Sequence, residues 1–397
     1  MKEKKKDNYE HTLYASYIGY VVQAIVNNFA PLLFLTFASA YGLTLGRITL
    51  VTTVNFLVQL GVDLLSAKLI DKIGCRTAIV TAHILSGAGM IGLAVLPELM
   101  GNPYAGLMLA TVLCAIGGGI IEVLISPMVE ACSTEKKEAA MSLLHSFYCW
   151  GHVLVILLST AFFYIAGIEN WRILAWVWAA IPFANAVCFS RVPIYPLTAE
   201  HEKISVGELL SRKTFWVIAI LMACAGASEQ AMSQWASAFA EAGLGVSKTL
   251  GDLAGPCAFG ICMGTARVLY GKYSDYLPLR KMMAGSAVLC VLCYAAAAFA
   301  RAPVLGLAGC ALCGFSVGIF WPGTYSIAAK ALKGGGTAMY AFLALAGDLG
   351  CCAGPTVVGL AADAAGGNLK AGLCAAMAFP VVIIMGLFWI EVKKIGN

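Results

Sequence analysis

The sequence predicts an all-α membrane protein with twelve transmembrane helices, arranged as two related six-helix bundles. Three observations support this prediction. Of the 397 residues, 60% are hydrophobic and 12% are charged, and the mean hydropathy is +0.83, which is more apolar surface than a soluble core of this size encloses. Long apolar stretches recur between short charged or Gly/Pro turns. A ten-residue motif occurs once in each half, 204 residues apart.

Twelve stretches are long enough to cross a bilayer, which needs roughly 20 mainly apolar residues. In chain order they are 13–40, 47–70, 77–98, 103–130, 139–166, 171–190, 214–240, 250–272, 281–300, 303–329, 336–362 and 369–391. The first contains Asn27 and Asn28 and is about twice the length of a signal-peptide core, so we interpret it as a transmembrane helix. The expected organisation is a tail at 1–12, bundles at 13–190 and 214–391, a linker at 191–213 and a tail at 392–397.

Basic residues predict the orientation of the chain. With a cytoplasmic N-terminus, twenty Lys and Arg residues fall in cytoplasmic segments and five in outside segments, and Arg267 alone lies within a span. Because cytoplasmic loops carry the excess of basic residues, both tails and the linker are expected in the cytoplasm. The net charge of +5 then reflects topology, and no nucleic-acid partner is expected. We expect a monomer in the plasma membrane, namely a bacterial inner membrane.

The 15 cysteines lie mainly in the apolar stretches, where free Cys acts as a small hydrophobic residue. Two CxxC pairs reproduce the spacing of a zinc ribbon, namely Cys290, Cys293, Cys310 and Cys313. Both pairs lie in uninterrupted apolar helices without a knuckle turn. We therefore expect no metal site, and nothing in the sequence indicates a cofactor.

The repeated motif ends the second span of each half. It reads Ala67-Lys-Leu-Ile-Asp71-Lys-Ile-Gly74-Cys-Arg76 in the first half and Gly271-Lys-Tyr-Ser-Asp275-Tyr-Leu-Pro278-Leu-Arg280 in the second. Repeated halves are typical of transporters that bind their solute near the bilayer midplane, between the repeats. Some channels and scramblases are also duplicated, so the repeat alone does not decide the function.

This G-x-x-x-D-x-x-G-x-R loop resembles the signature of the major facilitator superfamily, and the resemblance covers essentially the whole chain. It implies the superfamily fold of two pseudo-symmetric bundles and transport by alternating access. It also implies that Arg76 and Arg280 hold cytoplasmic helix ends, while Asp71 and Asp275 stabilise a closed inner gate. The first copy departs from the family pattern, because it has Ala67 where Gly is usual. A loop whose charges serve only topology is the alternative interpretation.

Ionisable side chains at membrane depth are costly and are by default functional candidates. Here they occur in spans two, four, five, seven, eight and eleven, whereas the cores of spans three, six, nine and twelve carry no charge. The third and sixth helices of each half are therefore predicted to face lipid, and the others a polar interior. The candidates are Asp63, Glu122, His145, His152, Glu229, Arg267 and Asp348.

Two spans carry polar residues suited to a small polar solute. In span one, helical spacing places Tyr20, Gln23 and Asn27 on one face. Span seven concentrates donors and acceptors in two turns, namely Glu229, Gln230, Ser233, Gln234 and Trp235. Amides and carboxylates beside aromatic rings are what a polyhydroxylated solute needs. The aromatic candidates are Tyr20, Trp150, Trp235 and Trp321, although interface or core packing accounts for any single Trp equally well.

Glu122 is the main candidate for proton coupling. It follows three consecutive glycines, Gly117 to Gly119, and lies one turn before Ser126-Pro127. Burial disfavours an ionised carboxylate, so this group is suited to bind and release a proton as access alternates. The alternative is a permanently protonated Glu that bonds to a neighbouring helix. Glu229 and Asp348 are further candidates for proton coupling.

Several buried charges are candidate gating residues. Asp63 and Arg267 occupy equivalent positions in the two halves. We hypothesise that they form an ion pair that exchanges during transport, or that Arg267 pairs with Glu229, Asp348 or His145. A static pair that holds helices together is the alternative. In span five, His145, Cys149 and His152 share a face, which favours a hydrogen-bonded polar seam over a metal site.

Three segments resemble the fucose:proton symporter branch of the superfamily, namely Gly119-Ile-Ile-Glu122-Val-Leu-Ile-Ser-Pro127, Leu144-His145-Ser-Phe147-Tyr-Cys-Trp-Gly151 and Ala346-Gly-Asp348-Leu-Gly-Cys-Cys-Ala-Gly354-Pro355. The resemblance implies proton-coupled uptake of a sugar or similar solute, with Glu122 in proton coupling. Span one lacks the carboxylate of the best-known sugar porter of the branch. The alternatives are an exporter of drugs or organic ions by proton antiport and a non-transporting membrane sensor. No nucleophile motif or phosphate loop indicates an enzyme.

Overall fold

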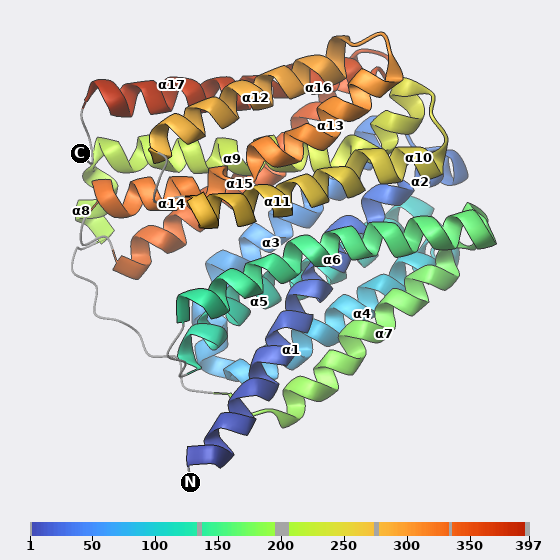
Figure 1. Ribbon diagram of the computed structural model, residues 1–397. Helices are drawn as coiled ribbons and strands as arrows, with labels where there is room; N and C mark the ends of the chain where they lie inside the picture. Colours follow the sequence, from blue (N-terminus) through green and yellow to red (C-terminus); the bar gives the residue numbers. More distant parts are fainter. Residues whose placement is uncertain (1, 133–136, 195–205, 274–277, 333–335, 394–397) are drawn as a thin grey trace. The chain divides into compact units, whose positions relative to one another are not determined.

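The structure is a computed structural model that describes residues 2–132, 137–194, 206–273, 278–332 and 336–393. Every regular element in these ranges is a helix (Figure 1). The elements are α1 (Lys2–Asn28), η1 (Ala30–Leu33), α2 (Phe34–Tyr41), α3 (Leu45–Ile73), α4 (Cys75–Leu99), α5 (Pro103–Ala131), α6 (Lys137–Ala166), η2 (Ile168–Asn170), α7 (Trp171–Arg191), α8 (Val206–Ser211), α9 (Lys213–Ala238), η3 (Phe239–Gly243), α10 (Lys248–Asp252), η4 (Leu253–Cys257), α11 (Ala258–Tyr273), α12 (Leu279–Phe299), α13 (Pro303–Val317), α14 (Phe320–Ala331), α15 (Gly336–Ala364), α16 (Leu369–Ala376) and α17 (Ala378–Val392).

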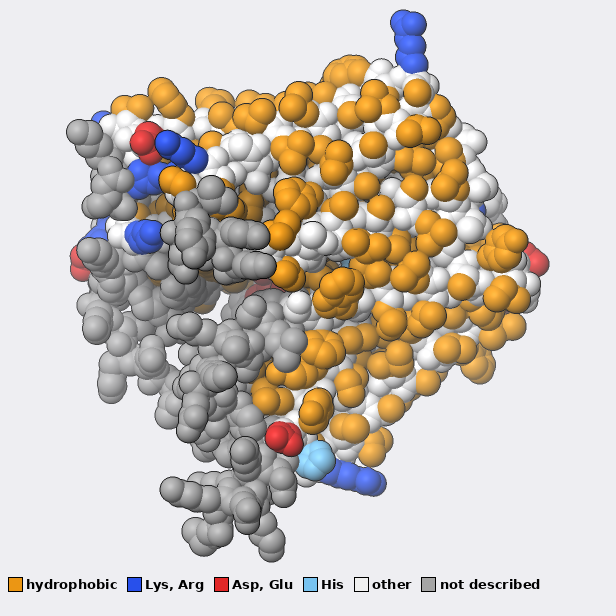
Figure 2. Space-filling model, in the orientation of Figure 1, with side chains coloured by type: hydrophobic (Ala, Val, Ile, Leu, Met, Phe, Trp, Pro, Cys, Tyr) orange, Lys and Arg blue, Asp and Glu red, His pale blue; other side chains and the backbone are white. Residues whose placement is uncertain are grey.

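The described residues contain twelve helical segments long and apolar enough to cross a membrane, as predicted. The first runs from Glu10 to Tyr41 and the last from Leu369 to Val392. Many large apolar side chains remain exposed on these helices, and Figure 2 shows hydrophobic side chains over much of the visible face. Such a surface is suited to lipid, and helices satisfy their own backbone hydrogen bonds there. The predicted all-α membrane fold is confirmed.

Four spans are interrupted where hydropathy predicts one continuous helix. The first span passes through the short 3₁₀ helix η1 at Pro31, and the eighth passes through the π-helical η4, which contains Pro256. The tenth is broken between α13 and α14 at Gly318, and the twelfth between α16 and α17 at Met377. Proline removes one helical hydrogen bond and crowds the preceding turn, which accounts for the first two interruptions.

The helices form two compact units. Unit 1 comprises residues 1–43 and 54–198, and unit 2 comprises residues 44–53 and 199–397. The first turns of α3 therefore belong to unit 2 and the rest of α3 to unit 1. In sequence, unit 1 holds most of the first six spans and unit 2 holds the last six.

The same helix pairs recur in both units. In unit 1, α1 packs along α6, and α4 packs along α5 and α7. In unit 2, α9 packs along α15, and α12 packs along α13 and α17. In each half, then, the first span packs on the fifth, and the third packs on the fourth and sixth. This correspondence is the structural counterpart of the repeated sequence motif.

Glycines permit the close approach of α15 to α9 in unit 2. A Cβ at Gly350 would overlap the backbone of Ala223, and a Cβ at Gly354 would overlap the backbone of Ala227. In unit 1, a Cβ at Gly151 of α6 would lie 3.2 Å from Val21 Cα of α1. The first-to-fifth pairing therefore depends on glycine in both units, because small residues let helix backbones approach closely.

Candidate functional site

Four amide side chains, three of them buried, form a hydrogen-bonded network with a carboxylate in unit 1. Gln23 Nε2 donates to Glu122 Oε2 at 2.8 Å and to Gln59 Oε1 at 3.2 Å. Gln59 Nε2 donates to Asn27 Oδ1 at 3.0 Å, and Asn55 Nδ2 donates to the same oxygen at 3.4 Å. We call Gln23, Gln59, Asn27 and Asn55 the amide chain. It connects α1 and α3 with Glu122 on α5.

Helical spacing and glycine together position this network. Gln23 and Asn27 are four residues apart on α1, and Asn55 and Gln59 are four apart on α3, so each pair shares one helix face. A Cβ at Gly118 of α5 would lie 2.9 Å from Gln23 Oε1, and one at Gly119 would lie 3.2 Å from Gln59 Cα. The glycines before Glu122 thus let α5 approach both α1 and α3.

The amide chain is almost inaccessible to solvent. Gln23 is 2% exposed, Gln59 is 3% exposed and Asn27 is 7% exposed, whereas Asn55 is half-buried. Gln23 and Asn27 were predicted to bind solute, but the contacts described above engage both amide groups inside the protein. Gln23 Oε1 has no hydrogen-bond partner among the described residues.

Two further candidates lie beside Glu122. Asp63 on α3 interacts electrostatically with the Glu122 carboxylate. The hydroxyl of Tyr20 lies 2.7 Å from Ser126 Oγ, one turn along α5 from Glu122. Unit 1 therefore brings together Tyr20, Gln23, Asn27, Asp63 and Glu122. His152 is buried on α6, and the side chain of His145 lies outside the described residues.

In unit 2, Arg267 of α11 pairs with Glu229 of α9. Arg267 Nη2 lies 3.6 Å from Glu229 Oε2, and the Glu229 side chain is only 7% exposed. This ion pair is one of those considered for Arg267 from the sequence. A distance of 3.6 Å is longer than a charge-assisted hydrogen bond, so the two groups attract each other without the close fork of a bidentate pair.

The other candidate residues of α9 lie within two turns of Glu229. Gln234 Nε2 donates to Gln230 Oε1 at 3.2 Å. The Trp235 ring is completely buried, and its indole N–H donates to the carbonyl oxygen of Pro355 at 2.9 Å. Trp235, predicted to bind solute, therefore uses its only donor to hold α15 against α9.

Trp321 and Asp348 lie near each other in unit 2. The Trp321 ring of α14 packs against Gly347 of α15, the residue before Asp348. Its centroid lies 6.4 Å from that of Tyr325. Trp321 and Asp348 are both half-buried.

The predicted gating arginines make equivalent contacts in the two units. Arg76, near the start of α4, donates through Nη1 to the carbonyl oxygens of Phe189 and Ser190 at 2.9 and 2.8 Å. Arg280, near the start of α12, donates through Nη1 to Glu391 Oε2 at 3.1 Å. Each arginine thus ties the start of the third span to the end of the sixth within its own unit. The side chains of Asp71 and Asp275 lie outside the described residues.

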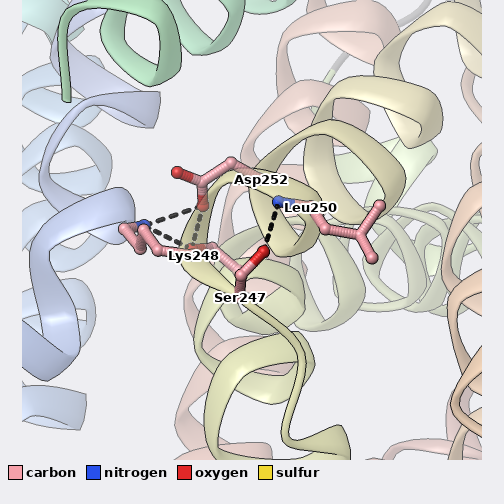
Figure 3. A network of polar contacts seen from close by, with 5 residues as sticks. Ser247, Lys248, Leu250 and Asp252 are labelled. Atoms are coloured by element: carbon pink, nitrogen blue, oxygen red, sulfur yellow. Dashed lines mark hydrogen bonds and ion pairs between the residues drawn. The ribbon is translucent and has the colours of Figure 1, made fainter. Parts of the chain in front are cut away.

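Sequence reasoning missed a buried charge cluster in unit 2. Lys248 Nζ donates to Asp252 Oδ1 at 2.7 Å and to Ser237 Oγ at 2.9 Å, and Ser237 Oγ donates to Asp252 Oδ1 at 2.5 Å. Figure 3 shows this pair beside Ser247, which caps α10 by accepting from the Leu250 N–H. The available signal was the four-residue spacing of Lys248 and Asp252. Lys248 is one of the five basic residues that the sequence assigns to outside segments, and that assignment gives no reason to pair it with a buried carboxylate.

A second missed group lies in unit 1, on spans three and six. His83 Nδ1 is 2.8 Å from the carbonyl oxygen of Ile79, and Asn185 Nδ2 is 2.9 Å from His83 Nε2. Because a carbonyl only accepts, Nδ1 carries the proton and Nε2 accepts from Asn185, which makes the imidazole neutral. Asn185 Nδ2 also donates to Ala15 O at 3.0 Å. A lone His and a lone Asn in different spans gave no pattern that could have revealed this contact.

The four cysteines with zinc-ribbon spacing face each other on α12 and α13. Cys290 Sγ and Cys313 Sγ are 3.9 Å apart, and all four side chains are buried. In the part of the chain that the structure describes, no three His, Cys, Asp or Glu side chains come together as metal ligands would.

The family model described as Major Facilitator Superfamily matches residues 16–355. The chain belongs to the major facilitator superfamily. It is accordingly a multi-pass membrane protein of a transporter family rather than an enzyme. No curated protein sequence matches it significantly.

Solved structures share this major facilitator fold at low sequence identity. A bacterial homolog of the human lysosomal transporter Spinster, in an inward-facing and occupied conformation, has a TM-score of 0.78 at 13% identity, with 98% of each chain covered. The major facilitator transporter FucP, in the outward conformation, has a TM-score of 0.64 at 17% identity, covering 96% of this chain and 99% of that one. A second structure of FucP, described as the E. coli fucose:proton symporter, has a TM-score of 0.65 at the same identity and coverage. At such identities the likeness shows the fold alone.

Proposed function

We propose that the protein is a proton-coupled secondary transporter that takes up a sugar or a similar small polar solute by alternating access across a bacterial inner membrane. The observation that carries this proposal is Glu122, a membrane-embedded carboxylate held by the Gln23 amide beside a second carboxylate, Asp63. Two carboxylates that interact inside a membrane protein disfavour double ionisation, so one of them is suited to hold a proton.

The resemblance to the fucose:proton symporter branch supports this assignment. FucP, whose name states proton symport of fucose, has the same fold over nearly the whole chain. The branch resemblance of the segment around Glu122 assigns proton coupling to this residue. Glu229 and Asp348 are the corresponding candidates in unit 2, where Glu229 already interacts with Arg267.

Solute contacts are proposed for polar and aromatic groups in each unit. In unit 1 these are the hydroxyl of Tyr20 and the amides of Gln23 and Asn27, whose hydrogen bonds within the protein a solute would have to replace. In unit 2, the α9 residues Gln230 and Gln234 supply amide groups, and the half-buried Trp321 supplies a ring face. Amides that donate and accept together suit adjacent hydroxyl groups, and a ring face suits the C–H surface of a sugar.

The test uses proteoliposomes that contain the purified protein and carry an imposed pH gradient. Labelled hexoses, deoxyhexoses, nucleosides and cationic dyes are offered in turn. Uptake against a concentration gradient when the outside is acidic supports symport, because inward proton flow then drives solute inward. Efflux of a dye under the same gradient would instead identify an antiport exporter. Solute accumulation that does not depend on the imposed pH gradient would contradict proton coupling.

Glu122→Gln tests the coupling residue directly. A neutral amide cannot release a proton, so gradient-driven accumulation should be lost while exchange of labelled for unlabelled solute remains. Glu98→Gln is the matched control, because Glu98 is an exposed carboxylate that pairs with Arg172. Unchanged accumulation in Glu122→Gln would contradict the assignment.

A further inference from the structure

The amide chain of unit 1 has two possible directions of hydrogen bonding. In the observed direction, Gln23 donates to Glu122 and to Gln59, while Gln59 and Asn55 both donate to Asn27. Rotating a side-chain amide by about 180° about its last C–C bond exchanges the positions of its oxygen and nitrogen and leaves the shape of the group unchanged. If all four amides turn, every bond keeps its place and its donor becomes its acceptor.

The reversed direction requires a proton on Glu122. In the observed direction Glu122 Oε2 only accepts, which an ionised carboxylate can do. After reversal, Gln23 Oε1 faces Glu122, so the carboxyl group must donate and therefore must be protonated. Both directions contain the same four contacts. An ionised Glu122 consequently permits only the observed direction, whereas a protonated Glu122 permits both.

An unsatisfied acceptor at Gln23 marks where the two directions differ. Gln23 is 2% exposed, and its Oε1 has no hydrogen-bond partner among the described residues. This oxygen faces Gly118, where a Cβ would approach it to 2.9 Å. Reversal gives this oxygen two donors, Glu122 and Gln59, and places Nε2 in the position that faces Gly118. Each direction therefore leaves one Gln23 atom without a partner at this position.

Asn55 is the half-buried end of the amide chain. In the observed direction its nitrogen is engaged with Asn27. After reversal its oxygen accepts from Asn27, and its N–H₂ group is released instead. A proton bound at Glu122 therefore allows the group that α3 presents at Asn55 to change from an acceptor to a donor, with no helix movement required.

We propose that Gln23, Gln59 and Asn27 are positioning residues that relay the protonation state of Glu122 to Asn55 on α3. This inference rests on the proposed role of Glu122 in proton coupling. All members of the relay lie in unit 1. Titratable groups on the helices packed around it include Asp63 on α3, Tyr17 and Tyr20 on α1, His83 on α4, Cys114 on α5, and Tyr148, Cys149 and His152 on α6.

Infrared difference spectroscopy tests the relay without knowledge of the solute. The full chain is purified, reconstituted in lipid and titrated with acid and base. The chain contains four glutamines, Gln23, Gln59, Gln230 and Gln234, so carbon-13 in the glutamine side chains labels these residues alone. The relay predicts that a labelled glutamine carbonyl band shifts at the same pH at which a protonated carboxyl band appears, and that Glu122→Gln removes both changes.

Two variants separate a relay from a structural role. Gln59→Met removes the amide that joins Gln23 to Asn27 at similar side-chain length. It should keep the Glu122 carboxyl band and lose part of the glutamine shift. Asn28→Leu is the control, because Asn28 is a buried amide on α1, the helix of Gln23 and Asn27, and its side-chain nitrogen donates locally to Ala24 O. It should give the spectrum of the unmodified protein.

The possible outcomes distinguish the relay from the proposed function. If the Glu122 carboxyl band titrates while the labelled glutamine bands stay fixed, the relay is refuted and Glu122 remains a proton site. If Glu122→Gln removes no carboxyl band, Glu122 does not titrate, and both the coupling site and the relay fail. If Gln59→Met does not fold, Asn27→Leu serves in its place. It removes the hydrogen bond between Gln59 and Asn27, and the measurement is the shift of the labelled Gln59 carbonyl band.

Discussion

At the scale of single residues, the buried polar groups of this protein are largely occupied with one another. Gln23, Asn27 and Trp235 were expected to face a solute, yet each makes hydrogen bonds within its own unit. Spacing along one helix reveals which residues share a face. It does not reveal that Gln23 reaches Glu122 from 99 positions away in the sequence.

The contact between His83 and Asn185 gives a prediction at this scale. Asn185→Leu removes the donor to His83 Nε2 and the second donor to Ala15 O, which also accepts within α1. Because the buried His83 nitrogen is left unbonded, the free energy of unfolding should fall by about 1–3 kcal/mol. Thermal unfolding in detergent measures this change. In a double-mutant cycle with His83→Leu, the double variant should lose less unfolding free energy than the sum of the losses in the two single variants. Additive effects would contradict an energetic coupling.

At the scale of elements, composition predicts the helices well and their interruptions poorly. The spans were found because a bilayer crossing requires a long apolar stretch, whatever its details. The breaks at Pro31, Pro256, Gly318 and Met377 disappear when hydropathy is averaged over a span. The glycines of span four were expected to allow close backbone approach, and Gly117 and Gly119 do so against α4 and α3.

The packing of α15 on α9 gives a prediction at the scale of elements. Gly354→Ala places a methyl group on the backbone of Ala227, which cannot move aside as a flexible side chain could. We expect this variant to melt at a markedly lower temperature or to fail to accumulate. Gly285→Ala is the control, since a Cβ there meets nothing within 4 Å. It should be neutral or gain about 0.5–1 kcal/mol from its higher helix propensity. Equal behaviour of the two variants would contradict the packing argument.

At the scale of the whole molecule, the sequence repeat anticipated the repeated packing of spans in units 1 and 2. Arg76 and Arg280 show this correspondence, because each bonds to the last turn of the sixth span in its own unit. The sequence repeat did not indicate that residues 44–53 group with unit 2. Contacts that depend on tertiary packing rather than on periodicity leave no regular pattern to read.

The orientation of the molecule gives the third prediction. The bias of basic residues predicts that both termini lie in the cytoplasm and that the segment between η3 and α10 lies outside. A green fluorescent protein fused after Asn397 should fluoresce, and alkaline phosphatase inserted after Gly245 should be active. Alkaline phosphatase inserted into the 191–213 linker serves as the control and should be inactive. Active phosphatase at the linker would reverse the assigned orientation.

The two π-helical segments of unit 2, η3 and η4, lie on either side of the Lys248–Asp252 pair. A π turn closes its hydrogen bond one residue later than an α turn, so each segment holds one amino acid more than the same turn of regular helix. Removing a residue from a regular helix rotates everything beyond it by about 100°. Within η3 or η4 such a loss can be absorbed by converting the π turn to an α turn. At η3 and η4, therefore, one residue can be lost while the side chains of the adjoining helices keep their orientation.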